Sequence, residues 1–298
     1  MIAHKLRGYD GHFCIREAFR IAKELNITNI SAIPNSNEKF MSFTIGRLKF
    51  IDSFQFMGSS LEKLVENLFD KEDKYKHFHH MKREFPKHLD LLCRKGIYPY
   101  TWFDDTKKFK YKGLPPIEDF YSDLKQEKPS EEDYQHALNV YYTLNCEVFQ
   151  DYHITYLKTD VLLLADVFTR FRETCLESYQ LDPANYISAP GLAWDAMLKM
   201  TGIELDLISD LELFSFFEDM KRGGLCFVGS KRHAKANNKY LADFDSSKPS
   251  TYIMCWDANN LHGWSMMQAL PCRNIKFYKE FSLEDILDTA DDAPTGYA

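Results

Sequence analysis

The stretch YHITYLKTDVLLLADVFTRF, residues 152–171, has the apolar spacing of one long amphipathic helix, expected to run from about 152 to 176. Within it, Tyr156 and Asp160 are four residues apart and therefore share a face. A tyrosine that positions a water and an aspartate that binds a metal ion would form one wall of a two-metal nuclease site. An ordinary half-exposed helix pair has the same spacing, so both interpretations stay open for this stretch alone. Three apolar residues are expected to form the buried stripe beside the pair: Val161, Leu164 and Phe168.

The residues before this helix mix helical and strand patterns, which predicts an α/β fold. Four elements are expected there: a helix over 12–25, a hairpin over 40–56, a short helix capped by Ser60 and a helix over 132–144. Residues 71–135 are charged, aromatic and interrupted by prolines. We expect them to form insertions and loops on a domain surface and not a core.

The turn-rich segment LDPANYISAPG, residues 181–191, is the candidate domain boundary. A helix is expected after it over 192–200, and an apolar strand over 252–256 ends at Asp257. Because a strand end is a rigid mount for a side chain, Asp257 is a candidate functional carboxylate.

The composition is that of a globular protein. No apolar run approaches the roughly 20 residues of a membrane span, and the first residues lack the pattern of a secretory signal. The seven cysteines include no Cys-x-x-Cys pair, which argues against a zinc site or a disulfide framework. We therefore expect no membrane partner and a reducing intracellular compartment.

The charge distribution is uneven. The net charge is −7, yet residues 220–242 contain six Lys or Arg and no Asp or Glu. Glycines and asparagines inside this segment allow backbone amides to approach an anion, so it could hold phosphates. A solvated charged face is an equal alternative.

Four motifs, in their order along the chain, carry a resemblance to a known family. They are LRGYDGHF ending at residue 13, SLEKL at 60–64, YLKTD at 156–160 and DANNLHGW at 257–264. With them, the chain resembles the family B DNA polymerases of the protein-primed, organellar and viral branch. Its longer matches are similar to the polymerases of Polinton or Maverick DNA transposons.

The resemblance implies an α/β fold in two parts. Residues 1–180 would form a partial RNase H-like 3′–5′ exonuclease domain, with residues 71–135 as an insertion. Residues 181–298 would form a linker and the N-terminal part of a polymerase palm. The implied function is template-directed deoxynucleotide transfer in DNA replication, by a nucleotidyltransferase that depends on Mg²⁺.

The resemblance also implies roles for individual residues. Asp10, Asp160 and Asp257 would bind Mg²⁺, and Tyr156 would act beside Asp160 in catalysis. The segment Asn260-Leu261-His262 would contact the incoming deoxynucleoside triphosphate. Seven residues would contact primer-template or single-stranded DNA: Ser60, Leu61, Arg222, Gly223, Gly224, Lys231 and Arg232. The Ser60-Leu61 element would also contact a terminal priming protein.

The chain departs from the family pattern in its ligands. The Asp-x-Glu pair that precedes the second exonuclease motif is missing, because Asp210-Leu211-Glu212 comes after the third motif. The later polymerase motifs, which supply a second Asp and the nucleotide-binding Lys and Tyr, are missing too. We therefore expect a fragment with little or no catalysis by itself.

Three single positions also differ from the family pattern. Lys5 stands where the family has an Asn that holds single-stranded DNA. His262 stands where a Tyr screens the sugar, and Lys221 stands where an aromatic residue opens the glycine element.

Two alternatives to a polymerase enzyme remain. A non-catalytic remnant would bind single-stranded DNA or phosphates through residues 221–239 and Ser60-Leu61. A stand-alone RNase H-like nuclease would need further carboxylates on a strand near Asp10, and Asp52 is the one candidate.

Overall fold

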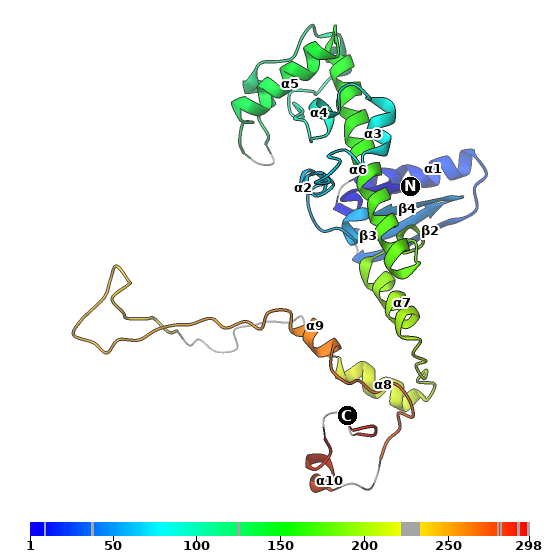
Figure 1. Cartoon of the computed structure of the whole chain (residues 1–298), viewed down its shortest axis with the longest axis vertical. Coiled ribbons are helices and arrows are strands. Elements are labelled where there is room, and N and C mark those ends of the chain that lie inside the picture. Colours follow the sequence, from blue (N-terminus) through cyan, green and yellow to red (C-terminus); the bar gives the residue numbers. More distant parts are fainter. Residues whose placement is uncertain are drawn as a thin grey trace. The chain divides into compact units, whose positions relative to one another are not determined.

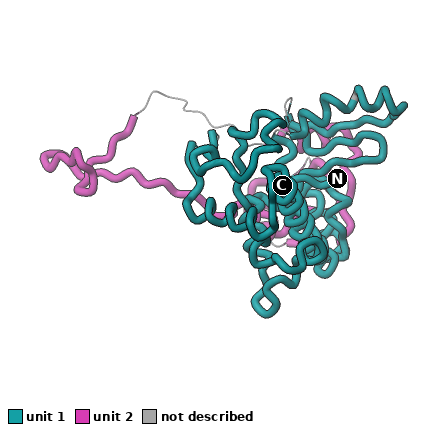
Figure 2. Tube along the Cα trace, turned by 90° about the horizontal axis from the view of Figure 1, so that it is seen from above, with its two compact units in different colours: residues 1–202 teal, residues 203–298 magenta. Residues whose placement is uncertain are grey.

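The computed structural model describes residues 1–8, 10–36, 39–123, 126–221, 233–278, 280, 282–290 and 293–296. The chain divides into two compact units, residues 1–202 and 203–298, which Figure 2 shows in teal and magenta. Among the described residues, no helix is long and apolar enough to cross a membrane.

A four-stranded sheet forms the N-terminal part of the first unit (Figure 1). Its strands are β1 (Ile2–Ala3), β2 (Ile30–Ser36), β3 (Lys39–Ile45) and β4 (Leu48–Asp52), in the order β1-β4-β3-β2. β1 runs parallel to β4, and the other two pairs are antiparallel. β3 and β4 are the predicted hairpin, which is confirmed. Its turn requires a left-handed backbone at Gly46, with φ of 62°, which glycine adopts without a Cβ clash.

The predicted N-terminal helix is confirmed as α1 (Asp10–Glu24), which follows the short 3₁₀ helix η1 (Leu6–Gly8). Ala18 and Ala22 are buried on one face of α1. A side chain at Gly11 would place its Cβ 2.9 Å from the carbonyl oxygen of Leu6. Gly11 therefore lets the first turn of α1 pack directly against η1.

The remainder of the first unit is helical. Its α-helices are α2 (Leu61–Glu66), α3 (His79–Glu84), α4 (Leu89–Leu92), α5 (Glu131–Thr143), α6 (Phe149–Tyr179) and α7 (Ala189–Thr201). Its 3₁₀ helices are η2 (Ser53–Gln55), η3 (Thr106–Lys110), η4 (Ile117–Phe120) and η5 (Pro183–Asn185). The predicted helices over 132–144, 152–176 and 192–200 are therefore confirmed, with ends shifted by a few residues.

Helix α6 is the central helix of this unit (Figure 1). It contacts five other helices: α2, α3, η3, η5 and α7. Its 31 residues correspond to a length of about 46 Å. The predicted buried stripe is partly wrong: Phe168 is buried, but Val161 is 57% exposed. Leu163 and Val167 face the core, since α2 and α3 pack on that side of α6.

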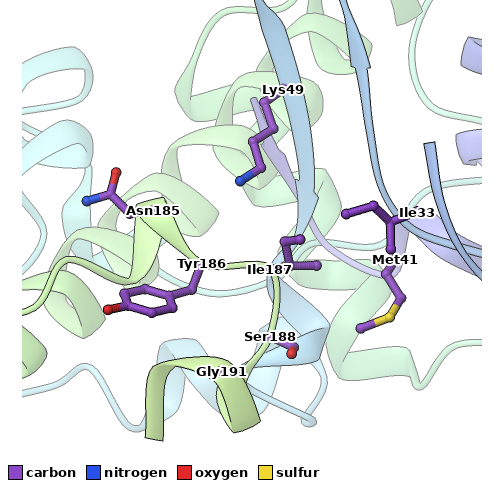
Figure 3. A pocket seen from close by; sticks show the side chains of 8 residues that line it. All are labelled: Ile33, Met41, Lys49, Asn185, Tyr186, Ile187, Ser188 and Gly191. Atoms are coloured by element: carbon purple, nitrogen blue, oxygen red, sulfur yellow. The ribbon is translucent and has the colours of Figure 1, made fainter. Parts of the chain in front are cut away.

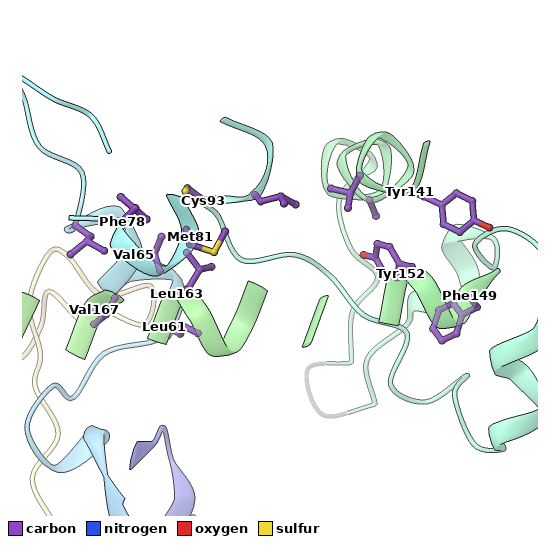
Figure 4. Close-up of a cluster of buried hydrophobic side chains, with 14 residues drawn as sticks. Leu61, Val65, Phe78, Met81, Cys93, Tyr141, Phe149, Tyr152, Leu163 and Val167 are labelled. Atoms are coloured by element: carbon purple, nitrogen blue, oxygen red, sulfur yellow. The ribbon is translucent and has the colours of Figure 1, made fainter. Parts of the chain in front are cut away.

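Residues 71–135 supply much of the core, contrary to the expectation of surface loops. Phe78 and Met81 are completely buried, and Leu92 and Cys93 join them in the main cluster. Figure 4 shows this cluster spread along α6, with Tyr141 and Phe149 among its other members. α3 and η3 of this segment pack against α6. Sequence periodicity cannot reveal an apolar face over so few residues.

A buried carboxylate joins α6 to α3. Asp166 is fully buried and accepts hydrogen bonds from the backbone N–H of His80 at 2.8 Å and of Met81 at 3.1 Å. Nδ1 of His80 lies 2.8 Å from the same carboxylate. The residue that precedes α3, Phe78, makes no side-chain cap. Asp166 therefore caps α3 from a neighbouring helix and satisfies its free N–H groups.

The second unit contains α8 (Leu211–Met220), α9 (Leu261–Met266) and α10 (Leu283–Leu287) among its described residues. The strand predicted over 252–256 is wrong, because these residues form no strand and Trp256 is 86% exposed. A strand needs a hydrogen-bonding neighbour. In the described part of this unit, the isolated bridge between Asn237 and Thr251 is the one strand-like pairing.

The mixed α/β character predicted from the sequence is confirmed. The division between the two compact units falls at residue 202, after α7. The boundary expected near residue 181 lies on the other side of α7, and the assignment of two functional domains stays a prediction.

Candidate functional site

Asp10 is the first residue of α1 and is exposed. The positive end of the helix dipole favours an anionic side chain at this position. Residues His4–Gly8 precede α1 in the chain, so the contacts that fix these residues also determine the position of Asp10.

Asp52, at the end of β4, fixes the segment from His4 to Gly8 by hydrogen bonds. The carboxylate of Asp52 is fully buried and accepts hydrogen bonds from the backbone N–H of Lys5 at 2.8 Å, Arg7 at 3.1 Å and Phe54 at 3.0 Å. Both carboxylate oxygens therefore accept hydrogen bonds from backbone N–H groups. This geometry contradicts the hypothesis of Asp52 as a metal ligand: the residue positions the turn before Asp10.

His4 ties the same segment to the start of α2. Its ring nitrogens lie 3.0 Å from Oγ of Ser53 and 2.9 Å from the carbonyl oxygen of Ser59. Burial lowers the pKa of His4, against the opposing effect of the Ser59 hydrogen bond. The turn before Asp10 and the Ser60-Leu61 element are thereby held together.

Ser60 and Leu61 have different surroundings. Ser60 is exposed and caps α2, with its hydroxyl oxygen accepting from the N–H of Lys63 at 3.3 Å. Leu61 is only 7% exposed and belongs to the main core cluster. Any direct DNA contact predicted for this pair would therefore fall mainly on Ser60.

On α6, Tyr156 and Asp160 face the segment Lys95–Tyr100, which sequence analysis did not single out. The hydroxyls of Tyr100 and Tyr156 are 2.7 Å apart, and Nζ of Lys95 lies 3.8 Å from Oδ2 of Asp160. A Cβ added to Gly96 would lie 3.5 Å from the ring of Tyr156. The signal that could have suggested this segment is KGIYPY, a lysine and a glycine beside two tyrosines.

Burial and neighbouring charges shift the pKa values of Asp160 and Tyr100. Burial raises the pKa of Asp160, although the cation of Lys95 acts in the opposite direction. Burial raises the pKa of Tyr100, the hydrogen bond with Tyr156 acts against it, and the negative charges of Asp160 and Asp10 make smaller contributions that raise it. Most of the Tyr100 ring is exposed, so burial concerns the hydroxyl end that meets Tyr156.

The pKa of Tyr156 is also raised, first by burial and then by Asp160 and Tyr100. Its hydroxyl therefore stays protonated and can donate a hydrogen bond. The site thus offers two carboxylates, two phenol hydroxyls and one lysine cation, contributed by α1, α6 and the segment before η3.

These donors fit a hard divalent cation in part. Carboxylate oxygens are the ligands Mg²⁺ prefers, and Asp10 and Asp160 provide two of them. No group of three His, Cys, Asp or Glu side chains that could hold a metal ion occurs in the described part of the chain. Lys95 also competes with a metal ion for Asp160.

The third predicted metal ligand, Asp257, lies in the second unit and is exposed. Asn260, Leu261 and His262 are exposed as well, at the start of α9. Asn260 adopts a left-handed backbone with φ of 53°, and a side chain at Gly263 would clash with the Asn260 amide. The segment after Asp257 therefore forms a defined turn. Five predicted DNA-binding residues lie outside the described residues: Arg222, Gly223, Gly224, Lys231 and Arg232.

Comparisons with known proteins give a consistent result. The family model described as DNA polymerase type B, organellar and viral, matches residues 1–285. A probable DNA polymerase of Neurospora intermedia is 23% identical over 310 aligned residues, which cover 99% of this chain and 27% of that protein. The chain thus spans about a quarter of the length of this relative. No solved structure matches.

Proposed function

Because the chain belongs to the organellar and viral type B DNA polymerases, we propose that it supplies part of a protein-primed DNA-directed DNA polymerase. In this proposal, residues 1–180 belong to an RNase H-like 3′–5′ exonuclease domain. Residues 181–298 form the linker and the beginning of the palm. DNA primer-template, deoxynucleoside triphosphates and a terminal priming protein are the proposed partners.

The match of the type B polymerase family model to residues 1–285 supports this proposal best. In the first unit, the hydroxyl of Tyr156 lies 2.7 Å from that of Tyr100, and Nζ of Lys95 lies 3.8 Å from Oδ2 of Asp160. Tyr156 and Asp160 are, with Asp10, the residues that the family resemblance assigns to the exonuclease site.

Each residue of the cluster has a proposed role in hydrolysis of a phosphodiester bond. Asp10 and Asp160 would hold Mg²⁺, which when bound neutralises phosphate charge and lowers the pKa of a water. The protonated hydroxyl of Tyr156 would orient that water. Tyr100 would hold the hydroxyl of Tyr156 in place, and Lys95 would offset phosphate charge next to Asp160.

In the second unit, Asp257 is the proposed palm ligand for Mg²⁺, with Asn260, Leu261 and His262 next to the incoming nucleotide. Arg222, Gly223, Gly224, Lys231 and Arg232 are proposed to contact the DNA backbone. Backbone amides and cations suit a phosphate chain without regard to base sequence.

We propose that the 298-residue polypeptide alone binds single-stranded DNA but catalyses little. Asp10 and Asp160 alone supply too few carboxylates to fix a pair of metal ions in the manner of two-metal catalysis. Lys95 further weakens metal binding at Asp160. A DNA-binding remnant is therefore the second candidate function.

The test combines chemistry and binding. The purified polypeptide is incubated with MgCl₂, a primed template and deoxynucleoside triphosphates, and separately with a 5′-labelled single strand. We expect neither extension nor shortening of the strands. Binding of a labelled oligonucleotide should weaken steeply as salt rises, and Lys231→Glu with Arg232→Glu should make that dependence shallower.

Two outcomes would contradict the proposal. Extension that is abolished by Asp257→Ala would show that the polypeptide is a competent polymerase by itself. Binding that does not depend on salt would remove the proposed contacts to the DNA backbone.

A further inference from the structure

A cavity of about 360 Å³ lies in the first unit between the sheet and the segment that leads into α7 (Figure 3). The ring of Tyr186 is turned away from Ile33 and Met41. The amine of Lys49 lies apart from the hydroxyl of Ser188. These polar groups therefore do not converge on one point, whereas the aromatic side chains behind the candidate site do converge, on a histidine of α6.

The ring of Tyr98 contacts both tyrosines of the candidate site. Its centroid lies 5.0 Å from that of Tyr156, with the ring planes tilted by 35°. Its centroid also lies 5.0 Å from that of Tyr100, in an edge-on arrangement. Because packed rings restrict one another's rotation, the position of Tyr98 helps to determine where the hydroxyls of Tyr100 and Tyr156 meet.

His153 binds the hydroxyl end of Tyr98. This hydroxyl lies 2.8 Å from Nδ1 of His153, which is three residues before Tyr156 on α6. Burial lowers the pKa of His153 and raises the pKa of Tyr98 to about 12, so near neutral pH the imidazole is uncharged and the phenol is protonated. Because a phenol is a stronger donor than an imidazole N–H, Tyr98 donates to Nδ1, and the imidazole proton is on Nε2.

Aromatic side chains fix the imidazole of His153 in turn. Its ring stacks on that of Phe103, with 5.6 Å between centroids, and meets the ring of Phe109 in η3 edge-on at 5.0 Å. One residue earlier on α6, the hydroxyl of Tyr152 donates to the carbonyl oxygen of Ile97 at 2.6 Å. The imidazole and the backbone of the neighbouring tyrosine segment are thereby both anchored to α6.

We propose that His153 is a positioning residue of the candidate site: by accepting a hydrogen bond from Tyr98, it fixes the ring of Tyr156 and hence the direction of the Tyr156 hydroxyl. His153 acts through Tyr98 and not by contact with the reacting groups. The use of the Tyr156 hydroxyl to orient a water rests on the proposed function. The positioning itself requires no activity of the chain.

The test follows the Tyr156 hydroxyl in the full chain, without DNA or metal ions. NMR of isotope-labelled tyrosines measures how fast its hydroxyl proton exchanges with water, and Tyr156→Phe assigns the signal. Three variants change the hydrogen bond: His153→Ala removes the acceptor, His153→Asn replaces Nδ1 by an amide oxygen, and Tyr98→Phe keeps the ring without its hydroxyl. The matched control is His88→Ala, at a half-buried histidine whose side chain does not cap α4.

We expect His153→Ala and Tyr98→Phe each to accelerate this exchange about tenfold, the factor for the loss of one hydrogen bond. His153→Asn should return the rate close to that of the parent, and His88→Ala should leave it unchanged. Because both substitutions remove the same bond, the double variant His153→Ala, Tyr98→Phe should exchange no faster than either single variant.

Three outcomes would overturn the inference: the parent rate in Tyr98→Phe, additive effects in the double variant, or no rescue by a folded His153→Asn. Thermal melting shows which variants are folded. If His153→Ala does not fold, Tyr98→Phe and His153→Asn decide the question. Absence of DNA binding by the parent chain would count against the proposed function and leave the positioning role of His153 standing.

Discussion

Asp52→Ala should lower the free energy of unfolding of the first unit by about 3 kcal/mol, because it removes the acceptor of three partly buried N–H groups. The loss should be largest around the turn before Asp10. Hydrogen exchange at Lys5 and Arg7 should accelerate strongly, since their N–H groups donate directly to this carboxylate. Thermal melting measures the stability, and exchange locates the loss.

Two further variants make the prediction specific. In Asp52→Asn, the amide oxygen can still accept from the N–H groups of Lys5 and Phe54, which both donate to Oδ1 of Asp52. The loss of stability should therefore be smaller than for Asp52→Ala. Glu66→Ala, at an exposed position of α2, should change stability by less than about 0.5 kcal/mol. Equal stability of Asp52→Ala and the parent would show that the carboxylate does not hold the turn.

Asp166→Ala should cost about 4 kcal/mol, because it leaves two N–H groups at the start of α3 without their acceptor, at roughly 1–3 kcal/mol for each unsatisfied donor. The carboxylate is the acceptor for two N–H groups at the start of α3 and lies against the imidazole of His80. α3 carries Met81, which is completely buried, so its loosening would also expose core. Chemical denaturation measures the change.

Glu177→Ala is the matched control, because Glu177 is an exposed acidic residue of the same helix. Its stability should stay close to that of the parent. A loss of less than about 1 kcal/mol for Asp166→Ala would mean that α3 finds another cap.

Elements defined by local sequence were predictable. The hairpin around Gly46 follows from alternation and a turn residue, and α1, α5 and α6 follow from helical spacing and capping. The burial of residues 71–135 was not predictable, because short helices broken by prolines show no period. The strand before Asp257 was predicted from its apolar residues, but strand formation depends on a neighbouring strand and not on composition.

The candidate site was predictable only in part. The resemblance pointed to Asp10, Tyr156 and Asp160, and in the first unit the hydroxyl of Tyr156 lies beside that of Tyr100. Lys95 and Tyr100 were missed because no spacing in the sequence relates them to α6. Asp52 was considered as a ligand, whereas its burial and its three backbone donors make it a support for the turn.

The central claim is that Asp10 and Asp160 hold one divalent ion beside Tyr100 and Tyr156. Its most direct test is Mn²⁺ titration of the full chain, followed by the paramagnetic broadening of the NMR signals of isotope-labelled tyrosine rings. Asp10→Asn and Asp160→Asn should each abolish the broadening at Tyr100 and Tyr156, whereas Glu66→Gln should not.

The pH dependence of the same titration follows from Asp160. A carboxylate binds Mn²⁺ only when deprotonated, and burial raises the pKa of Asp160. Binding should therefore be complete above this raised pKa and be lost as the pH falls through it, at a higher pH than for an ordinary aspartate. Broadening of both rings that survives in the Asp10→Asn, Asp160→Asn double variant would contradict the account.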